Sequence, residues 1–242
     1  MENEINNQSV LKTYYSKYLT DVRGLSKSSV AHYLDALNNI SRRLRNKGLV
    51  SKDIYEIVDL EYLTSVRSVL FSDPDFIELD ERGRRMYSAG LNNYLRFASG
   101  EDFKIAISQV SRFDVPVAPS EAISTSNKVW KRSNILRAQV LVMANYKCEI
   151  DKNHQTFIAE KTNKAYMESH HLIPMKLQND FDYGLDIYAN IICLCPVCHR
   201  QIHYGLKKDR RNLIQILYDK RAERLGNSGI SISREEMIDL II

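Results

Sequence analysis

The sequence of 242 residues is short of several residue types that mark particular protein classes. It has five prolines, nine glycines and four cysteines, which excludes collagen-like, low-complexity and disulfide-rich secreted chains. No apolar run is long enough to span a bilayer, and the polar start Met1–Glu4 is unlike a signal peptide. We therefore expect a cytoplasmic protein with no membrane partner.

A strong net charge is also absent. The 34 basic and 30 acidic residues leave a formal charge of +4. After Ser120 there are 18 basic and 14 acidic residues, so the excess lies in the C-terminal half. So small an excess predicts a local basic surface and not a protein that is positive all over.

Residues that bind metals or transfer protons are concentrated in one quarter of the chain. All four cysteines and five of the six histidines lie between Tyr146 and Gly205. A soluble core does not require such residues, so their crowding predicts a metal-dependent site. Cys193 lies in an apolar run, and we interpret it as a buried strand residue that binds no metal.

The cysteine spacing predicts a structural zinc site. Cys195 and Cys198 form the Cys-x-x-Cys turn that lets two thiolates face one ion, and Cys148 can supply a third. We favour His154 as the fourth ligand because Cys₃His is a common zinc set. Asp151 remains the alternative.

A second metal site is predicted from the histidines. On the helix expected after the Cys-x-x-Cys turn, His199 and His203 share one face. His170 and His171 are neighbours in a strand predicted over residues 166–173, so their side chains are expected to point to opposite faces or to diverge at the end of the strand. One of these two can bind the ion while the other reaches a water molecule beside it.

The order and spacing of these residues closely resemble those of HNH endonucleases, which have the ββα-metal fold. The resemblance rests on Glu168-Ser169-His170-His171-Leu172-Ile173-Pro174 and Asn190-Ile191-Ile192-Cys193-Leu194-Cys195-Pro196-Val197-Cys198-His199-Arg200-Gln201-Ile202-His203. It implies that His171 is the general base and that Asn190 ties the loop together and helps to hold the base. It also implies that His170, His199 and His203 bind the catalytic ion. The four-cysteine members usually have cysteine where this chain has Asp151.

The resemblance implies hydrolysis of phosphodiester bonds in double-stranded DNA, and the residue types suit that chemistry. Neutral His171 would take a proton from water, and the ion would contact the scissile phosphate and the departing 3′ oxygen. Imidazole ligands accept magnesium, manganese, nickel or zinc. Arg200, beside the ligands, is either a phosphate contact or a solvated arginine.

Residues 8–100 have a helical pattern. Helices are expected over residues 10–19, 30–40, 60–70 and 82–97, and Ser26 or Ser28 can cap the second. The tyrosines at helical spacing are expected in the core.

This half is loosely similar to the helical core-binding domain of tyrosine recombinases, through Arg23-Gly24-Leu25-Ser26-Lys27-Ser28-Ser29-Val30 leading into Tyr33-Leu34. The resemblance implies a small helical domain that grips DNA. Two basic clusters are either phosphate contacts or solvated helix faces. They are Arg42, Arg43, Arg45 and Lys47, and Arg82, Arg84 and Arg85.

A Pro- and Ser-rich stretch divides the chain. We expect a helical recognition domain over residues 1–114, a linker over 115–127 and a nuclease domain over 128–242. In the last, helices are predicted over residues 128–145, capped by Ser126 or Asn127, and over 209–225. Ser233 and Glu236 form a candidate capping box.

Together these patterns predict an α+β, mostly helical protein with a helical bundle and a zinc-stapled ββα-metal domain. The predicted function is a DNA endonuclease of restriction or defence, with modified DNA as a candidate substrate and a homodimer as the hypothesised assembly. The alternative is a non-catalytic zinc module that binds nucleic acid or protein. Such a module would have no use for the His170-His171 pair, Asn190 and His203 together.

Overall fold

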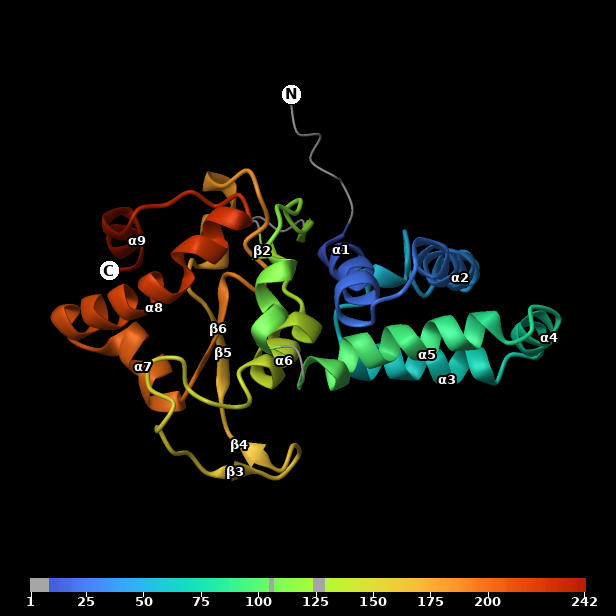
Figure 1. The fold of residues 1–242 in the computed structure, drawn as a ribbon, viewed down its shortest axis with the longest axis horizontal. Helices are drawn as coiled ribbons and strands as arrows, with labels where there is room; N and C mark the ends of the chain where they lie inside the picture. Colours follow the sequence, from blue (N-terminus) through green and yellow to red (C-terminus); the bar gives the residue numbers. More distant parts are fainter. Residues whose placement is uncertain (1–8, 105–106, 124–128) are drawn as a thin grey trace. The chain divides into compact units, whose positions relative to one another are not determined.

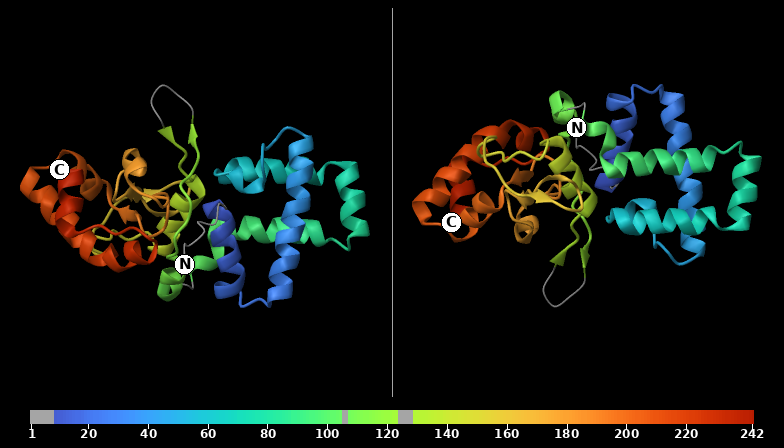
Figure 2. Two further views of the ribbon diagram at one scale, coloured as in Figure 1. Left: turned by 90° about the horizontal axis from the view of Figure 1, so that it is seen from above. Right: turned by 90° about the horizontal axis from the view of Figure 1, so that it is seen from below.

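The computed structural model describes residues 9–104, 107–123 and 129–242. It is mostly helical, and the strands of the described residues form three two-stranded antiparallel sheets (Figures 1 and 2). Two compact units are present: a helical unit, Leu11–Asp102 with Ser133–Ile135, and a C-terminal unit made mainly of Phe103–Arg132 and Leu136–Ile242. No helix within the described ranges is both long and apolar enough to cross a lipid bilayer.

The helical unit begins with two helices whose ends follow from local hydrogen bonds. A π-helical turn extends the first helix, and Ser26 caps the second because its Oγ accepts a hydrogen bond from the backbone N of Ser29 at 3.2 Å. Asp59 and Asp73 cap the next two helices in the same way. The elements are α1 Val10–Lys17, η1 Tyr18–Val22, α2 Lys27–Asn46, η2 Ile54–Glu56, α3 Leu60–Phe71, α4 Pro74–Arg82, α5 Met86–Ser99 and η3 Glu101–Lys104.

Tyrosine and phenylalanine rings fill the core of this unit, as the helical spacing predicted. Tyr15 is fully buried, and its ring centroid lies 5.0 Å from that of Tyr94 and 5.5 Å from that of Phe97. The Tyr15 hydroxyl donates to Oδ1 of Asn93 at 2.9 Å, which satisfies a polar atom inside the core. Helix α2 packs closely on α5 at Gly90, where a Cβ atom would come within 2.8 Å of the Ala36 Cβ.

The predicted helix over residues 82–97 is wrong at its start. Helix α4 ends at Arg82, and α5 begins only at Met86. Between them Arg84 and Arg85 have left-handed backbones, with φ of 52° and 61°. Asp80 stabilises this turn because its carboxylate accepts a hydrogen bond from the backbone N of Ser88 at 2.9 Å.

The C-terminal unit contains a β-hairpin followed directly by a helix. Strand β5 (Glu168–His171) pairs with β6 (Ile191–Leu194) in antiparallel register, with His170 opposite Ile192, and α7 (Pro196–Tyr204) follows. This is the ββα arrangement predicted from the sequence. The other elements are η4 Ile107–Phe113, β1 Ala122–Ile123, β2 Val129–Trp130, α6 Asn134–Met143, β3 Ile158–Ala159, β4 Lys164–Ala165, η5 Met175–Asp180, α8 Lys207–Asn227 and α9 Arg234–Ile241.

A buried ion pair joins α8 to the segment before the hairpin. Arg221 on α8 contacts Glu149 at 2.6 Å and donates to the backbone O of Tyr188 at 2.9 Å. Glu149 in turn accepts a hydrogen bond from the backbone N of Cys193 on β6 at 2.8 Å. These bonds fix the loop that carries Cys148 against the hairpin.

Two predicted helices of this unit have different bounds. Val129 and Trp130 form β2, paired with β1, so α6 begins only at Asn134. The expected caps Ser126 and Asn127 lie outside the described residues. Helix α8 runs through Gly226 to Asn227.

The predicted capping box is confirmed, since Ser233 and Glu236 exchange hydrogen bonds at the start of α9. The two compact units divide between Asp102 and Phe103. The roles assigned to residues 1–114, 115–127 and 128–242 stay predictions.

Candidate metal-dependent active site

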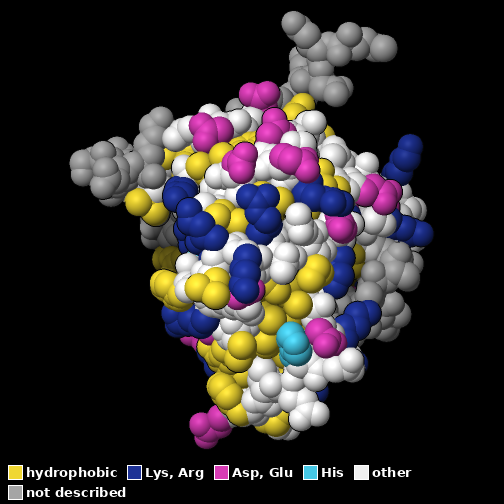
Figure 3. Space-filling view, turned by 90° about the vertical axis from the view of Figure 1, so that its left-hand side faces the viewer, with side chains coloured by type: hydrophobic (Ala, Val, Ile, Leu, Met, Phe, Trp, Pro, Cys, Tyr) yellow, Lys and Arg dark blue, Asp and Glu magenta, His cyan; other side chains and the backbone are white. Residues whose placement is uncertain are grey.

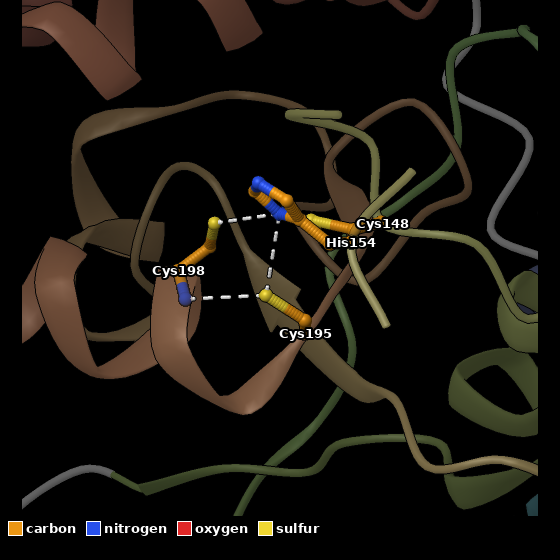
Figure 4. A group of neighbouring side chains, drawn as sticks. All are labelled: Cys148, His154, Cys195 and Cys198. Atoms are coloured by element: carbon orange, nitrogen blue, oxygen red, sulfur yellow. Dashed lines mark hydrogen bonds between the residues drawn. The ribbon is translucent and has the colours of Figure 1, made fainter. Parts of the chain in front are cut away.

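Three cysteines and one histidine of the C-terminal unit converge on one point (Figure 4). One ligand atom from each of Cys148, His154, Cys195 and Cys198 lies within 4.8 Å of the others. His154 Nδ1 lies 3.4 Å from the sulfur of Cys198 and 3.5 Å from that of Cys195. Cys195 also caps α7, because its sulfur accepts a hydrogen bond from the backbone N of Cys198 at 3.4 Å. Three thiols and one imidazole are a donor set suited to structural zinc.

The alternative zinc ligand does not join this group. The exposed carboxylate of Asp151 lies 3.9 Å from Nε2 of His154, the nitrogen that faces away from the sulfur atoms. The geometry therefore favours His154 as the fourth donor. Asp151 instead accepts a hydrogen bond from the backbone N of Asn153 at 2.9 Å, which shapes the loop leading to the imidazole.

The thiols of this group already share protons unevenly. A hydrogen bond from Cys198 lowers the pKa of Cys148 to about 4, and the same bond raises the pKa of Cys198. A zinc ion would take all three cysteines as thiolates, so its binding would release their protons. Cys193 is fully buried in β6, where burial raises the pKa of its thiol, so it is the strand residue that the sequence predicted.

A second group consists of three histidines. His170 on β5 lies beside His199 and His203 on α7, with each of its ring centroid distances to them at 4.9 Å. The Nε2 atoms of His199 and His203 are 3.3 Å apart. Burial lowers the pKa of His170 to about 3, so its imidazole is neutral and has a lone pair for a divalent ion. These three residues could hold a catalytic metal ion.

Glu168 orients one of these ligands and was missed by the sequence reasoning. Its Oε2 lies 2.5 Å from Nδ1 of His199, which leaves Nε2 of the same ring to face His203. A carboxylate behind a metal-binding histidine fixes the ring and strengthens the ligand. Glu168 precedes His170 by two residues on a strand and therefore shares its face, which is a signal that the sequence contains.

His171 points away from this group, as strand alternation predicts. Its Nε2 lies 2.8 Å from Oδ1 of Asp186, and both side chains are buried. A carboxylate that accepts the Nε2 proton leaves Nδ1 as the nitrogen able to accept another. Asp186 was also missed, since it lies in an irregular segment where nothing in the sequence marks its partner.

Asn190 holds together the two segments that flank the His171–Asp186 pair. Its Oδ1 accepts a hydrogen bond from the backbone N of Ile173 at 2.7 Å. Its Nδ2 donates to the backbone O atoms of Ile173 and Leu185, both at 2.9 Å. The residue is fully buried, so these bonds satisfy polar groups that water cannot reach.

Basic side chains near the histidines are exposed. Arg200 follows His199 on α7, and Arg132, a residue that the sequence reasoning missed, is close enough for its charge to lower the pKa of His170. Figure 3 views the side of the C-terminal unit that carries α7 to α9 and shows Lys and Arg side chains spread over that face. A histidine is visible in its lower part, between apolar side chains and an acidic one.

The basic clusters of the helical unit have several local partners. Lys47 pairs with Asp73 at 2.6 Å, Arg42 donates to Asn39, and Arg45 donates to the backbone O of Lys52. Arg82 makes only an exposed contact with Glu78 at 3.6 Å. Arg43 is half-buried, and Arg84 and Arg85 are exposed in their left-handed turn.

Comparison with known proteins gives one partial similarity to report. No protein-family model matches the chain. Over 91 residues the sequence is 34% identical to the type IV methyl-directed restriction enzyme EcoKMcrA of Escherichia coli strain K12. The match covers 38% of this chain and 30% of that enzyme, so less than a third of the relative's length is represented.

Proposed function

We propose that the protein is a metal-dependent DNA endonuclease that acts in restriction, with modified DNA as its target. The observation that carries the proposal is that two adjacent histidines of strand β5 belong to different groups of side chains. His170 joins His199 and His203 in a metal-ligand group, while its neighbour His171 pairs with Asp186. A hydrolase needs a proton acceptor beside a centre of positive charge, and these two adjacent histidines provide both.

In this proposal His171 is the general base. Its Nδ1 takes a proton from the attacking water, and Asp186 holds the ring through Nε2 and stabilises the imidazolium that forms. Asn190 keeps this geometry by binding the backbone on both sides of the pair. A divalent ion on His170, His199 and His203 would supply charge relief at the scissile phosphate and the leaving oxygen. Arg200 and Arg132 would bind flanking phosphates.

The remaining predictions follow from a restriction role. The relative is named as a methyl-directed restriction enzyme, which supports methylated DNA as the substrate, and we expect that DNA to be double-stranded. We assign recognition to residues 1–114, linkage to 115–127 and cleavage to 128–242, with the basic clusters of the helical unit as phosphate contacts. A homodimer would place one active site on each strand, and the cytoplasm is the expected location.

The rival function is a zinc-binding interaction module without catalysis. The Cys₃His group alone would satisfy that role. It gives no reason for the Glu168–His199 contact of 2.5 Å or for the buried His171–Asp186 contact of 2.8 Å. In both contacts a carboxylate holds a histidine ring in one orientation, as a metal ligand or a general base requires. These contacts therefore favour the nuclease.

Plasmid cleavage tests the proposed function. Purified zinc-loaded protein is incubated with unmodified and cytosine-methylated plasmids in magnesium, manganese, nickel or zinc. We expect cutting that requires an added ion and is faster on methylated DNA. Equal cleavage rates on both plasmids would contradict the proposal that modified DNA is the target. DNA or protein binding without cutting under any ion would support the interaction module instead.

A further inference from the structure

A short β-ribbon beside the candidate active site carries two exposed apolar residues. Strands β3 and β4 pair antiparallel, and Figure 1 shows them projecting beyond β5 at one end of the C-terminal unit. Phe157 and Ile158 are 65% and 61% exposed. Asn163 closes the turn with a left-handed backbone and donates to the backbone O of Ala159 at 2.8 Å. Two large apolar residues of the ribbon are therefore left in contact with water.

The two exposed residues lie on opposite faces of the ribbon. Phe157 is bonded across it to Tyr166, and their rings stack with centroids 4.8 Å apart and an interplanar angle of 16°. Ile158 is paired with Ala165 and therefore points to the other face. A ribbon that packs against a flat protein surface hides one face. This ribbon instead leaves an exposed apolar side chain on each face.

Both ends of the ribbon are attached to the candidate metal centres. His154, three residues before Phe157, is in the Cys₃His group. At the other end the Tyr166 hydroxyl donates to Glu168 at 3.2 Å, and Glu168 holds His199. An isolated two-stranded ribbon is marginally stable, so these attachments fix its direction relative to the histidines. A polymer bound at the histidines would continue along the ribbon.

We propose that the β3–β4 ribbon lies in the major groove of duplex DNA, with Phe157 and Ile158 contacting the C5-methyl groups of pyrimidines. This inference rests on the proposed nuclease function and adds a methyl contact beside the cleavage site to the recognition assigned to residues 1–114. The major groove, about 12 Å wide, admits a two-stranded ribbon and is the groove in which C5-methyl groups are displayed. Exposed Lys161 and Lys164 at the turn supply positive charge for the phosphates that border the groove.

Methyl groups are the apolar feature of that groove. Thymine and 5-methylcytosine present a C5-methyl there, and unmodified cytosine does not. Burying one methyl against an apolar side chain should raise affinity about fourfold. The ribbon would therefore favour methylated DNA without any hydrogen bond to the modified base.

The test measures the binding of full-length zinc-loaded protein carrying His171→Ala, so that bound duplex is not cut. Fluorescence anisotropy compares one duplex with cytosine, with 5-methylcytosine, and with every thymine replaced by uracil. We expect a gain of about fourfold per contacted methyl and a matching loss with uracil. Adding Ile158→Ser or Phe157→Ala should remove the gain from one contacted methyl, about fourfold, and the double variant should bring the ratio close to one. Ile216→Ala, an exposed apolar change on α8, should leave it unchanged.

Because Phe157→Ala also removes the stacking of Phe157 on Tyr166, Phe157→Tyr is the control. It keeps an aromatic face and should retain the preference for methylated DNA. Zinc content of each variant reports an intact fold. The inference is overturned if methylation does not change affinity, or if the preference survives in the Phe157→Ala, Ile158→Ser double variant. The nuclease function is tested separately by incubating the same duplexes with protein that retains His171 and measuring their cleavage.

Discussion

The Nε2 atom of His171 lies 2.8 Å from Oδ1 of Asp186, and the two side chains are 9% and 5% exposed. The contact selects the ring nitrogen that stays available as a base, because the carboxylate engages the other one. It also places a negative charge where imidazolium would form. The pair therefore defines the proton-transfer half of the candidate site, and the three-histidine group defines the metal half.

Replacing Asp186 by Asn should slow cleavage about 10²–10⁴-fold, because the amide can donate to Nε2 and hold the wrong tautomer. The substitution is nearly isosteric, so zinc content and the unfolding midpoint should change little. Single-turnover cleavage measures the effect. Asp182→Asn, an exposed carboxylate in the same segment, is the control and should cleave normally. A normal rate in Asp186→Asn would mean that the pair is only structural.

Glu168→Gln should weaken binding of the catalytic ion about 10–100-fold, because His199 loses the carboxylate that fixes its ring. Isothermal titration of manganese or nickel into zinc-loaded protein measures this affinity. Glu160→Gln, exposed in the ribbon turn, should bind the ion as the unaltered protein does. If Glu168→Gln bound the catalytic ion with unchanged affinity, Glu168 would have no role in ion binding.

His154→Ala should release the structural zinc, whereas Asp151→Ala should retain it. The reason is that the imidazole Nδ1 lies among the sulfur atoms and the carboxylate does not. Metal content after gel filtration, with a thiol-reactive dye to report the freed cysteines, measures the difference. The opposite pattern would assign the fourth ligand to Asp151.

Features that depend on residues close together in the sequence could be predicted, and features that depend on contacts between distant segments could not. The ligand groups were predictable because thiol and imidazole spacing is a local property of a turn, a strand and a helix. The Ser26 cap and the Ser233–Glu236 capping box were predictable for the same reason. Asp186 was not, since its role exists only once an irregular segment returns to strand β5.

The helix boundaries were likewise not predictable where a contact with a distant residue determines them. The spacing over residues 82–97 is helical throughout, but Asp80 binds the backbone of Ser88 and stabilises a turn at Arg84 and Arg85. Likewise, Trp130 fits a helical pattern, yet the pairing of β2 with β1 takes it into a strand. In both places a contact formed after the chain folds overrides the local preference.

Asn190→Ala should destabilise the protein by about 3 kcal/mol or more. It leaves one buried N–H and two buried carbonyl groups without their partner, at about 1–3 kcal/mol each. Urea unfolding of zinc-loaded protein measures the change. Asn179→Ala, an exposed asparagine in η5, should alter stability by less than about 0.5 kcal/mol. Equal stability of the two variants would contradict the role given to Asn190.

The most direct test of the account is the rate of DNA cleavage by His171→Ala at saturating metal, measured beside the unaltered protein under single-turnover conditions. Zinc content and far-UV circular dichroism confirm that both proteins are folded. The account predicts a loss of about 10²–10⁴-fold, because no other group would take the proton from water at that position. Cleavage by His171→Ala at the unaltered rate would contradict the assignment of His171 as the general base.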